Sequence, residues 1–215
     1  MNRPALPPSI SEQLRLQVLR SHYLLDTPAE AAYDNLVQLA AHVCQVPMAA
    51  VNLIDEHRQW SKAAVGLERV ASPRDLSFCT HVVDGDAPLV VPDTHQDARF
   101  ADNPFVVGQP HLRFYAGLPL RSPLGVTLGT LAVFDQVPRT LTAEQMTLLE
   151  ALAQQVMAQL ELRFERIHHR LTALRLAVAQ RFSQRNTWQF YIDENRLLWT
   201  EGIYRLTGLS ADCFD

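Results

Sequence analysis

The stretch from Thr142 to Phe182 contains neither proline nor glycine, and this uninterrupted helical segment constrains the fold more than any other feature. Thr142 and Gln145 have the spacing of a capping box, which predicts that a helix starts there. A helix of this length extends about 60 Å. Its apolar residues recur at alternating three- and four-residue steps, as in a coiled coil: Leu149, Leu152, Val156, Leu160, Phe164, Ile167, Leu171, Leu174 and Val178.

One small sheet cannot cover an apolar stripe of that length. We therefore expect the distal half of the helix to pair with the same helix of a second chain, so that residues 142–182 hold a homodimer together. The alternative is a helix that folds back onto its own domain. The whole chain of 215 residues is long enough for one well-buried core with attachments and too short for two large domains.

The composition argues against several classes of partner. A formal net charge of −4, with both signs spread along the chain, provides no basic surface for phosphate backbones or anionic lipids. No apolar run reaches the roughly 20 residues needed to cross a bilayer, and the N-terminus lacks the layout of a secretory signal. We therefore expect a cytoplasmic protein that binds neither nucleic acid nor membranes.

The cysteines and lysines limit the chemistry of the chain. Cys44, Cys79 and Cys213 are far apart in the sequence and form neither a disulfide framework nor a CxxC metal pair. A reducing compartment fits this pattern, and we predict no metal site. Lys62 is the only lysine, so no lysine elsewhere in the chain is available for Schiff-base or phosphate-loop chemistry.

Two amphipathic helices are predicted before the first strand. Ser9 and Glu12 have capping-box spacing, and Thr27, Pro28 and Glu30 supply a second cap with proline at the first helical position. The second helix then runs through "AAYDNLVQLAAHVCQV". The apolar face expected for the first helix consists of Leu16, Leu19, Tyr23 and Leu24.

The middle of the chain has the alternating pattern of an antiparallel sheet. Two long polar stretches between the strands, 66–87 and 94–111, are predicted to carry short helices that fold over one face of the sheet. After Asn186, two further short strands and the start of a helix are expected. The strands predicted for the sheet are 48–55, 58–66, 88–93, 112–121 and 125–135.

Several motifs that follow one another in order resemble a GAF domain of bacterial sensory proteins: "LLDTPAEAAYDNLVQLAAHVC", "RQWSKAAVGL", "SFCTH", "VVPDTHQDARFADNPFV", "LRFYAGLPL" and "LGTLAVFDQVPRTLTAEQMTLLEALA". The segment "WQFYIDENRLLWTEGIYRLTGLS" is similar to the opening of a PAS domain. We accordingly divide the chain into an N-terminal arm (1–14), a GAF sensory domain (15–163), a linker helix of coiled-coil type (164–186) and the truncated start of a PAS-like domain (187–215).

The resemblance implies an α+β fold, with a central antiparallel sheet of about six strands, helices on one face and a long C-terminal coiled-coil-type helix. It also implies a ligand cavity between the other face and its covering loops. Such domains commonly precede histidine kinase or diguanylate cyclase outputs. None of those output motifs occurs here, so we expect no enzyme activity in this chain; a catalytic output domain, if one exists, lies beyond residue 215.

Eight residues are candidates for lining the cavity, and each also has a purely structural interpretation. The aromatic residues at strand positions suit either a cavity wall or plain core. Phe78, Cys79 and His81 suit either a ligand contact or a buried wall beneath the covering loop. The candidates are Trp60, Phe78, Cys79, His81, Asp93, Arg99, Phe114 and Tyr115.

The charged candidates allow two interpretations as well. Asp93 and Asp97 with Arg99 have the chemistry to hold a polar ligand, because a guanidinium suits a carboxylate or phosphate. Alternatively, Asp97 and Arg99 pair with each other and fix the loop. Asp135 is expected to close a turn.

The Cys79 and His81 pair raises the question of chemistry. A nucleophilic cysteine needs an oriented base, and residues two apart on a helix point about 200° apart. Phytochrome-like GAF domains attach bilin through a cysteine directly followed by histidine, whereas Thr80 intervenes here. We therefore expect neither bilin nor haem, assign no catalytic residue and leave the ligand unidentified. The segment "FADNPFV" does not reproduce the residue set that accompanies cyclic nucleotide binding in GAF domains.

We interpret the chain as a sensory module that binds an unidentified small molecule or partner and relays the signal through a dimeric helix to a downstream output domain. Two alternatives stay open. One is a thiol-based redox sensor or reductase centred on Cys79, and the other is a dimerisation scaffold that binds no ligand.

Overall fold

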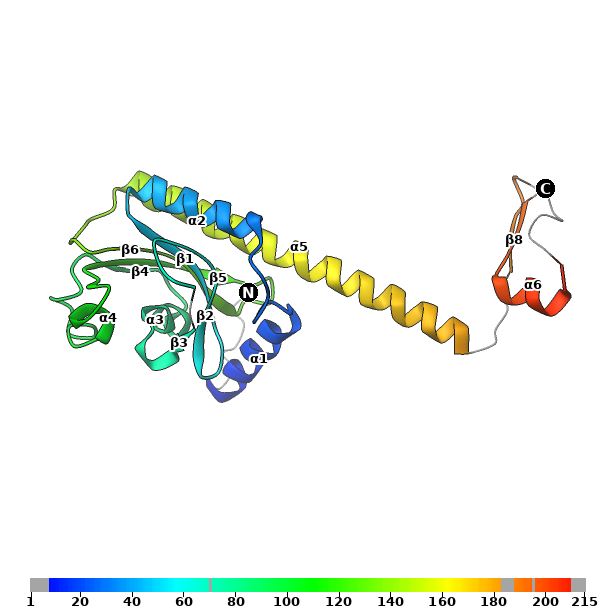
Figure 1. Ribbon diagram of the computed structural model, residues 1–215, viewed down its shortest axis with the longest axis horizontal. Helices are drawn as coiled ribbons and strands as arrows, with labels where there is room; N and C mark the ends of the chain where they lie inside the picture. Colours follow the sequence, from blue (N-terminus) through cyan, green and yellow to red (C-terminus); the bar gives the residue numbers. More distant parts are fainter. Residues whose placement is uncertain (1–7, 70, 183–187, 195, 210–215) are drawn as a thin grey trace, which may run out of the picture. The chain divides into compact units, whose positions relative to one another are not determined.

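The computed structural model describes residues 8–69, 71–182, 188–194 and 196–209, and Figure 1 traces the chain from blue to red. Two compact units, Met1–Phe164 and Glu165–Asp215, are described separately below.

The first unit is built on a six-stranded antiparallel sheet in the order β3-β2-β1-β6-β5-β4. The two central strands, β1 and β6, are buried along their whole length. The predicted fold class is therefore confirmed. The strand bounds are β1 Met48–Ile54, β2 Arg58–Val65, β3 Ser72–Pro73, β4 Leu89–Val91, β5 Phe114–Arg121 and β6 Thr127–Asp135.

Helices cover both faces of this sheet, as Figure 1 shows. Helix α2 (Ala31–Cys44) and the first part of α5 (Ala143–Phe182) lie on one face. Helices α3 (Phe78–Gly85) and α4 (Pro104–Val107) lie on the other, in the stretches predicted to fold over the sheet. Helix α1 (Pro8–Ser21) adds to the core on the α2 and α5 side.

Two separate apolar cores result. The helix-side core lies between the sheet and α1, α2 and α5, and it includes Leu19, Tyr33, Leu131, Val156 and Leu160. The lid-side core lies between the sheet and α3 and α4, and it includes Phe78, Cys79, Phe100, Tyr115 and Phe134.

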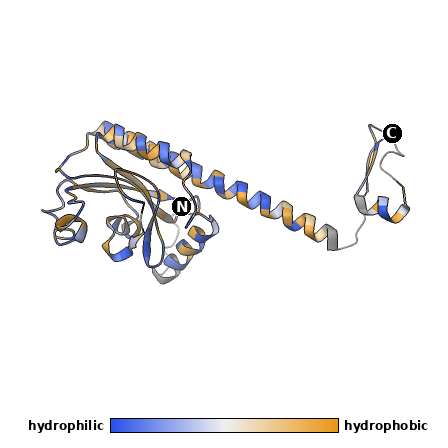
Figure 2. Cartoon of the chain, viewed as in Figure 1, coloured by the Kyte–Doolittle hydropathy of each residue, from blue (hydrophilic) through white to orange (hydrophobic). Residues whose placement is uncertain are grey.

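The capping box predicted for the long helix is confirmed. The Gln145 backbone N–H donates to Thr142 Oγ1 at 3.1 Å, and the Thr142 N–H donates to Gln145 Oε1 at 3.0 Å. The helix continues to Phe182 as predicted, but its apolar stripe changes environment along the way. Leu160 is fully buried, whereas Leu174 is 61% exposed. Hydrophobic residues nevertheless continue through the distal half, where Figure 2 colours several turns orange.

Two predictions about α1 are wrong. The helix begins at Pro8 and so includes Ser9, which was expected to cap it from outside. Tyr23 was expected on the apolar face, but it is 57% exposed because α1 ends at Ser21 and Tyr23 has a positive φ of 50°. Helical spacing no longer sets side-chain direction beyond the last turn. The other predicted face residues, Leu16, Leu19 and Leu24, are buried.

The predicted start of the second helix is also wrong. Helix α2 begins at Ala31 rather than at Pro28, and Glu30 occupies the N-cap position without a side-chain cap bond. The oxygens of Thr27, Pro28 and Glu30 instead accept hydrogen bonds from the buried ammonium of Lys62. Because an unpaired buried charge costs far more than a missing cap, this interaction outweighs the local capping signal.

In the second unit, strands β7 (Trp188–Tyr191) and β8 (Arg196–Trp199) form the predicted hairpin, and α6 (Glu201–Thr207) follows it. Trp188 is 64% exposed. Asn195 of the predicted turn lies outside the described residues, as do Cys213 and the expected boundary at 186 and 187.

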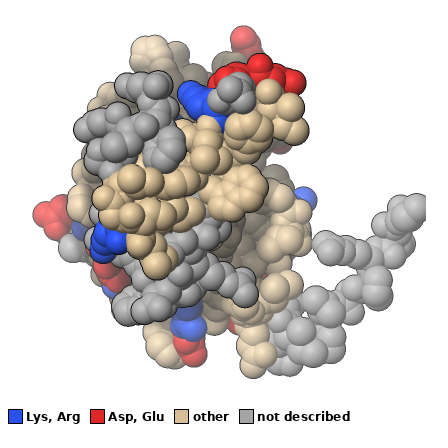
Figure 3. Space-filling model, turned by 90° about the vertical axis from the view of Figure 1, so that its right-hand side faces the viewer, with Lys and Arg blue, Asp and Glu red and all other residues tan. Residues whose placement is uncertain are grey.

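Charge and hydropathy agree with the sequence patterns. Acidic and basic side chains are interspersed in small groups on the face seen in Figure 3. In the part of the chain that the structure describes, no helix combines the length and the hydrophobicity needed to cross a bilayer. Within the same residues, no cluster of three or more His, Cys, Asp or Glu side chains is placed to hold a metal ion.

Buried Arg15 ties α1 to the sheet. Its guanidinium donates to the two carboxylate oxygens of Glu12 at 2.7 and 2.8 Å, and to the backbone oxygen of Ile54 at 2.5 Å. Arg74 donates to Glu12 at 2.6 Å and to Asp84 of α3 at 3.2 Å. Burial by itself would raise the pKa of Glu12, but the hydrogen bonds and charges of Arg15 and Arg74 lower it from 4.5 to about 2.

This arrangement predicts a pH dependence of stability. A lowered pKa in the folded state means that ionised Glu12 stabilises the protein above pH 4.5 and that this contribution is lost as the pH falls from 4.5 towards 2. Because the side chain of Glu12 is 35% exposed, solvent screening limits the loss to about 1–2 kcal/mol. Urea unfolding between these pH values should show a smaller decline for Glu12→Gln than for the unchanged protein. Parallel curves would contradict the assignment.

Candidate functional site

Helix α3 carries the predicted Cys79 and His81 over the sheet. Ser77 fixes its start, because the Ser77 hydroxyl accepts from the Cys79 backbone N–H at 3.0 Å and donates to Gln59 of β2 at 2.5 Å. Cys79 is 1% exposed, whereas His81 is exposed and its ring meets Phe100 edge-on with the centroids 4.9 Å apart. The thiol and the imidazole therefore point in different directions, as the helical angle between them requires.

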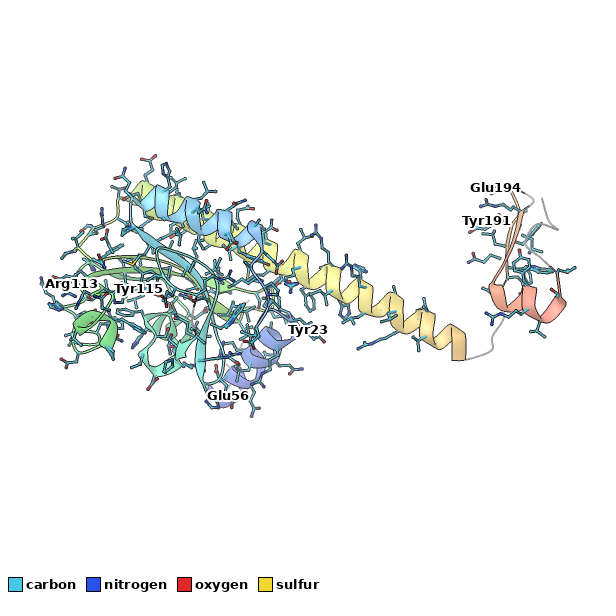
Figure 4. All side chains as sticks on the ribbon, in the orientation of Figure 1. Tyr23, Glu56, Arg113, Tyr115, Tyr191 and Glu194 are labelled. Atoms are coloured by element: carbon cyan, nitrogen blue, oxygen red, sulfur yellow. The ribbon has the colours of Figure 1, made fainter. Side chains whose placement is uncertain are left out.

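Tyr115 of β5 fills the centre of the lid-side core. Figure 4 labels it between the sheet and the α3 and α4 layer. The residue is fully buried, and its ring centroid lies 5.2 Å from that of Phe78 and 5.4 Å from that of Phe134. Phe78 in turn stacks on Phe100 at 4.3 Å. Burial raises the pKa of Tyr115 well above its ordinary value, so the phenol stays protonated.

Gly117 makes room for this tyrosine. A Cβ atom at Gly117 would overlap the phenol oxygen of Tyr115 and would stand 2.6 Å from its Cζ. A glycine inside a strand is a signal of such close approach, and this is the one sequence feature that pointed to the arrangement.

A short chain of hydrogen bonds joins the sheet to α3. The Ser61 hydroxyl donates to Asn52 Oδ1 at 2.6 Å, and Asn52 Nδ2 donates to Cys79 Sγ at 3.4 Å. The Tyr115 hydroxyl donates to the same sulfur at 3.5 Å. The thiol is thus held by groups of the sheet, and the exposed ring of His81 packs against Phe100 instead of contacting the thiol.

The remaining aromatic candidates lie on the opposite face. Phe114 belongs to the helix-side core, and Trp60 packs against that core. Side chains of successive strand residues point to opposite faces, so Phe114 and Tyr115 cannot line one cavity. Of the eight candidates, the structure brings together Phe78, Cys79 and Tyr115, with His81 at their rim.

The charged candidates fix their own loop. Arg99 pairs with Asp97, with Arg99 Nη2 lying 2.6 Å from Asp97 Oδ2. Asp93 accepts from the His95 backbone N–H at 3.0 Å and from Gln96 Nε2 at 2.8 Å. The loop interpretation therefore accounts for the geometry of both residues. Asp135 similarly accepts from the Gln136 backbone N–H at 2.6 Å as the chain leaves β6.

Sequence reasoning missed the role of Lys62, whose side chain is 0% exposed. Its ammonium donates to Thr27 Oγ1 at 2.7 Å, to the Pro28 carbonyl at 3.0 Å and to Glu30 Oε1 at 2.5 Å. The Tyr33 ring adds a cation–π contact with its centroid 5.2 Å from the nitrogen. Burial lowers the pKa of Lys62, against the opposing effect of the Glu30 hydrogen bond.

A second unforeseen cluster lies where the burial of α5 ends. His22 Nε2 lies 3.1 Å from Glu161 Oε1, and the His22 ring lies over Phe164 at 4.8 Å. Arg163 Nη2 donates to the Tyr23 carbonyl at 3.2 Å, near the Tyr23 label in Figure 4. The connection between α1 and α2 thus holds the segment 159–164 of α5, which we call the exit segment. The one sequence signal for the exit segment was the length of the apolar stripe, which is longer than one sheet can cover.

A surface hollow of about 390 Å³ lies elsewhere, beside α1 and α3. Glu12, Arg15 and Arg74 line it, and their charged groups are already paired with one another. None of the eight candidate residues lines it, so it does not coincide with the cavity expected under the covering loops.

A family model described as GAF domain matches residues 28–160. The chain belongs to the GAF domain family. The match begins just before α2 and ends at Leu160, the last fully buried residue of α5, so it spans the sheet and both of its layers. GAF domains are regulatory modules typical of sensory signalling proteins.

The similar proteins differ in what they do. A cyclic di-GMP phosphodiesterase of Pseudomonas aeruginosa is 39% identical over 138 residues, which cover 64% of this chain and 24% of that protein. The chain thus matches about a quarter of the relative's length. The solved GAF domain of an Acinetobacter phosphoenolpyruvate-protein phosphotransferase has a TM-score of 0.54 at 17% identity, covering 76% of this chain and 97% of that one.

A further solved structure with this fold belongs to a reductase. The type II free methionine-R-sulfoxide reductase of Thermoplasma acidophilum has a TM-score of 0.50 at 12% identity, covering 70% of this chain and 94% of that one. At this identity the likeness extends to the GAF fold alone.

The close fit of Tyr115 over Gly117 predicts a specific packing defect. Gly117→Ala should lower the free energy of unfolding by about 1–3 kcal/mol, because the buried phenol must shift. In a Tyr115→Leu background the same substitution should cost less than about 1 kcal/mol, since the overlap is gone. Urea unfolding of the four proteins measures the difference. An equal cost in both backgrounds would show that Tyr115 does not occupy this space.

Proposed function

We propose that this GAF domain is a sensory module that relays an input at its lid side through a dimer of α5 to an output domain. One observation carries the proposal. A regulatory fold continues without a break into a helix of 40 residues, and the apolar stripe of that helix is buried on the sheet only as far as Leu160.

The uncovered part of the stripe supports a second copy as the partner. Leu174 and Val178 are 61% and 44% exposed, and they keep the three- and four-residue spacing of the buried residues before them. An isolated helical segment is marginal in water, so an exposed stripe at this spacing favours pairing along the same seam. In the proposed homodimer the two exit segments lie side by side. A small rotation of each α5 helix there would be transmitted along the paired helices.

The lid side is the proposed place of input, with either a small molecule or a partner as the signal. The gap between the sheet and α3 is filled by Tyr115 and its aromatic neighbours. A small molecule would therefore have to part the lid and displace Tyr115. The same filled core favours the alternative of a dimerisation scaffold that binds no ligand.

The thiol alternative has less support. Cys79 is 1% exposed and Cys44 is 2% exposed, and burial raises the pKa of Cys44 to about 11. A reactive thiolate needs an accessible sulfur and a neighbouring base or cation.

The second unit supports a PAS-like assignment. One face of its hairpin carries the cross-strand pairs Trp188 with Trp199 and Phe190 with Leu197. A lone hairpin is marginal in water, so an aromatic face of this kind favours a hairpin that packs against further structure, as the ring of Trp199 does with Tyr204 of α6. The relative's name suggests an output in cyclic di-GMP turnover, and both assignments are part of the proposal.

The dimer is tested by mass. The full chain should elute from size exclusion with light scattering at twice 24.3 kDa, and Leu174→Glu should return it to 24.3 kDa at micromolar concentration. Leu174→Glu should separate the dimer because it would bury an unpaired carboxylate in the seam between the two helices. Ala173→Glu, one residue away and outside the stripe, is the matched control and should leave the dimer intact. A monomeric unchanged chain would end the relay proposal.

The thiol alternative is tested by labelling. Native protein exposed to mild peroxide and then to iodoacetamide should show Cys79 and Cys44 unmodified by mass mapping, whereas both should react after unfolding in urea. Oxidation of Cys79 in the native protein would favour the redox alternative over the relay proposed above.

A further inference from the structure

Ser61 and Lys62 are neighbours in β2, and their side chains point to opposite faces of the sheet, as those of successive strand residues do. Ser61 donates to Asn52, whose amide donates to Cys79 of α3, so this branch ends in the lid. Lys62 donates to Glu30 beside α2, so the other branch ends among the helices. The lid branch and the helix branch therefore start from adjacent residues of β2, the strand that pairs with β1.

A β-bulge lies at Lys62. Val51 of β1 pairs with Ala63, and Asn52 pairs with Ser61, so Lys62 is the extra residue of β2. A bulge lets two consecutive residues face the same side, and here Lys62 and Ala63 both face the helix-side core. The local ladder is interrupted at that point, because the extra residue has no partner in β1.

The helix branch continues to the exit segment of α5. Glu30 Oε1, which accepts from Lys62 at 2.5 Å, also lies 3.4 Å from Arg163 Nε. Tyr33 lies beside the Lys62 ammonium and donates from its hydroxyl to the Gln159 carbonyl at 3.3 Å. Lys62 therefore touches two groups that each contact α5 directly.

We propose that the Lys62 bulge is a built-in coupling element, which passes displacements of α3 through Ser61 to Lys62 and from there, through Glu30 and Tyr33, to the exit segment. The physical reason is that a buried charge holds its hydrogen-bond acceptors more strongly than neutral side chains hold their packing neighbours. An ammonium that is fully buried cannot give up its acceptors without a large penalty, so Glu30 follows Lys62 when the bulge shifts. Neutral packing contacts of the helix-side core carry no such constraint.

This inference rests on the proposed relay and names its path, but its readout lies within one chain. A monomeric protein would end the dimer proposal and leave the coupling measurable. Conversely, a result that disproves the coupling through Lys62 would leave the dimer proposal standing.

A double-mutant cycle in the full chain tests the coupling, with hydrogen exchange of the backbone amides 159–164 as the readout. Ser61→Ala breaks the lid branch at its start. Lys62→Met removes the charge but keeps a side chain of similar length, and Glu30 retains its contact with Arg163. Ser61→Ala should change exchange in this segment by about twofold or more in the unchanged background and by clearly less in the Lys62→Met background.

Val106→Ala is the matched control, because Val106 is buried in the lid-side core but lies on neither branch. Its effect on the exit segment should be the same with lysine or methionine at position 62. If Ser61→Ala does not fold, Cys79→Ala replaces it, since it removes the sulfur at the far end of the same branch. Equal effects of the lid substitution in both backgrounds, or no effect in either, would overturn the proposal.

Discussion

The sheet of this protein is apolar on both faces, and the rest of the structure follows from that constraint. Strands β1 and β6 are buried along every residue, so neither face can be left to water. Helices α2 and α5 cover one face, and α3 with α4 covers the other. The sheet separates the two cores, and Arg74, which contacts Glu12 of α1 and Asp84 of α3, links the lid to the helix side at the sheet edge.

The limited size of the sheet gives the long helix two different environments. Up to Leu160 its apolar stripe is part of the helix-side core, and beyond Phe164 the same spacing faces solvent. The exit segment between them is held by polar contacts from the connection of α1 and α2, through His22 and Arg163. A few identifiable side chains thereby hold α5 to the regulatory domain at the point where its burial ends.

Much of the fold could be predicted from periodicity because each element carries its own pattern. The capping box at Thr142, the strand alternation and the GAF-like motifs all depend on residues close in sequence. The start of α2 could not be predicted in the same way. Its capping signal at Thr27 competes with the buried ammonium of Lys62, which is 35 residues away and needs those oxygens more.

The candidate site shows the same division. The sequence placed Phe78, Cys79 and Tyr115 at the lid, and the structure brings them together. It also proposed Trp60 and Phe114 for that cavity, and both lie on the other face. A strand residue can be assigned to a face only when the pairing register of the strand is known. A bulge, such as the one in β2, shifts that register by one residue.

By itself, then, the sequence determined most of the helices and strands, the GAF family and the extent of the long helix, because these depend on local spacing and on ordered motifs. Only the tertiary structure decided that Tyr115 fills the lid-side core over Gly117 and that Lys62 joins β2 to the exit segment. Both outcomes rest on contacts between distant segments, where steric fit and the desolvation of one charge select among arrangements that local patterns leave equivalent.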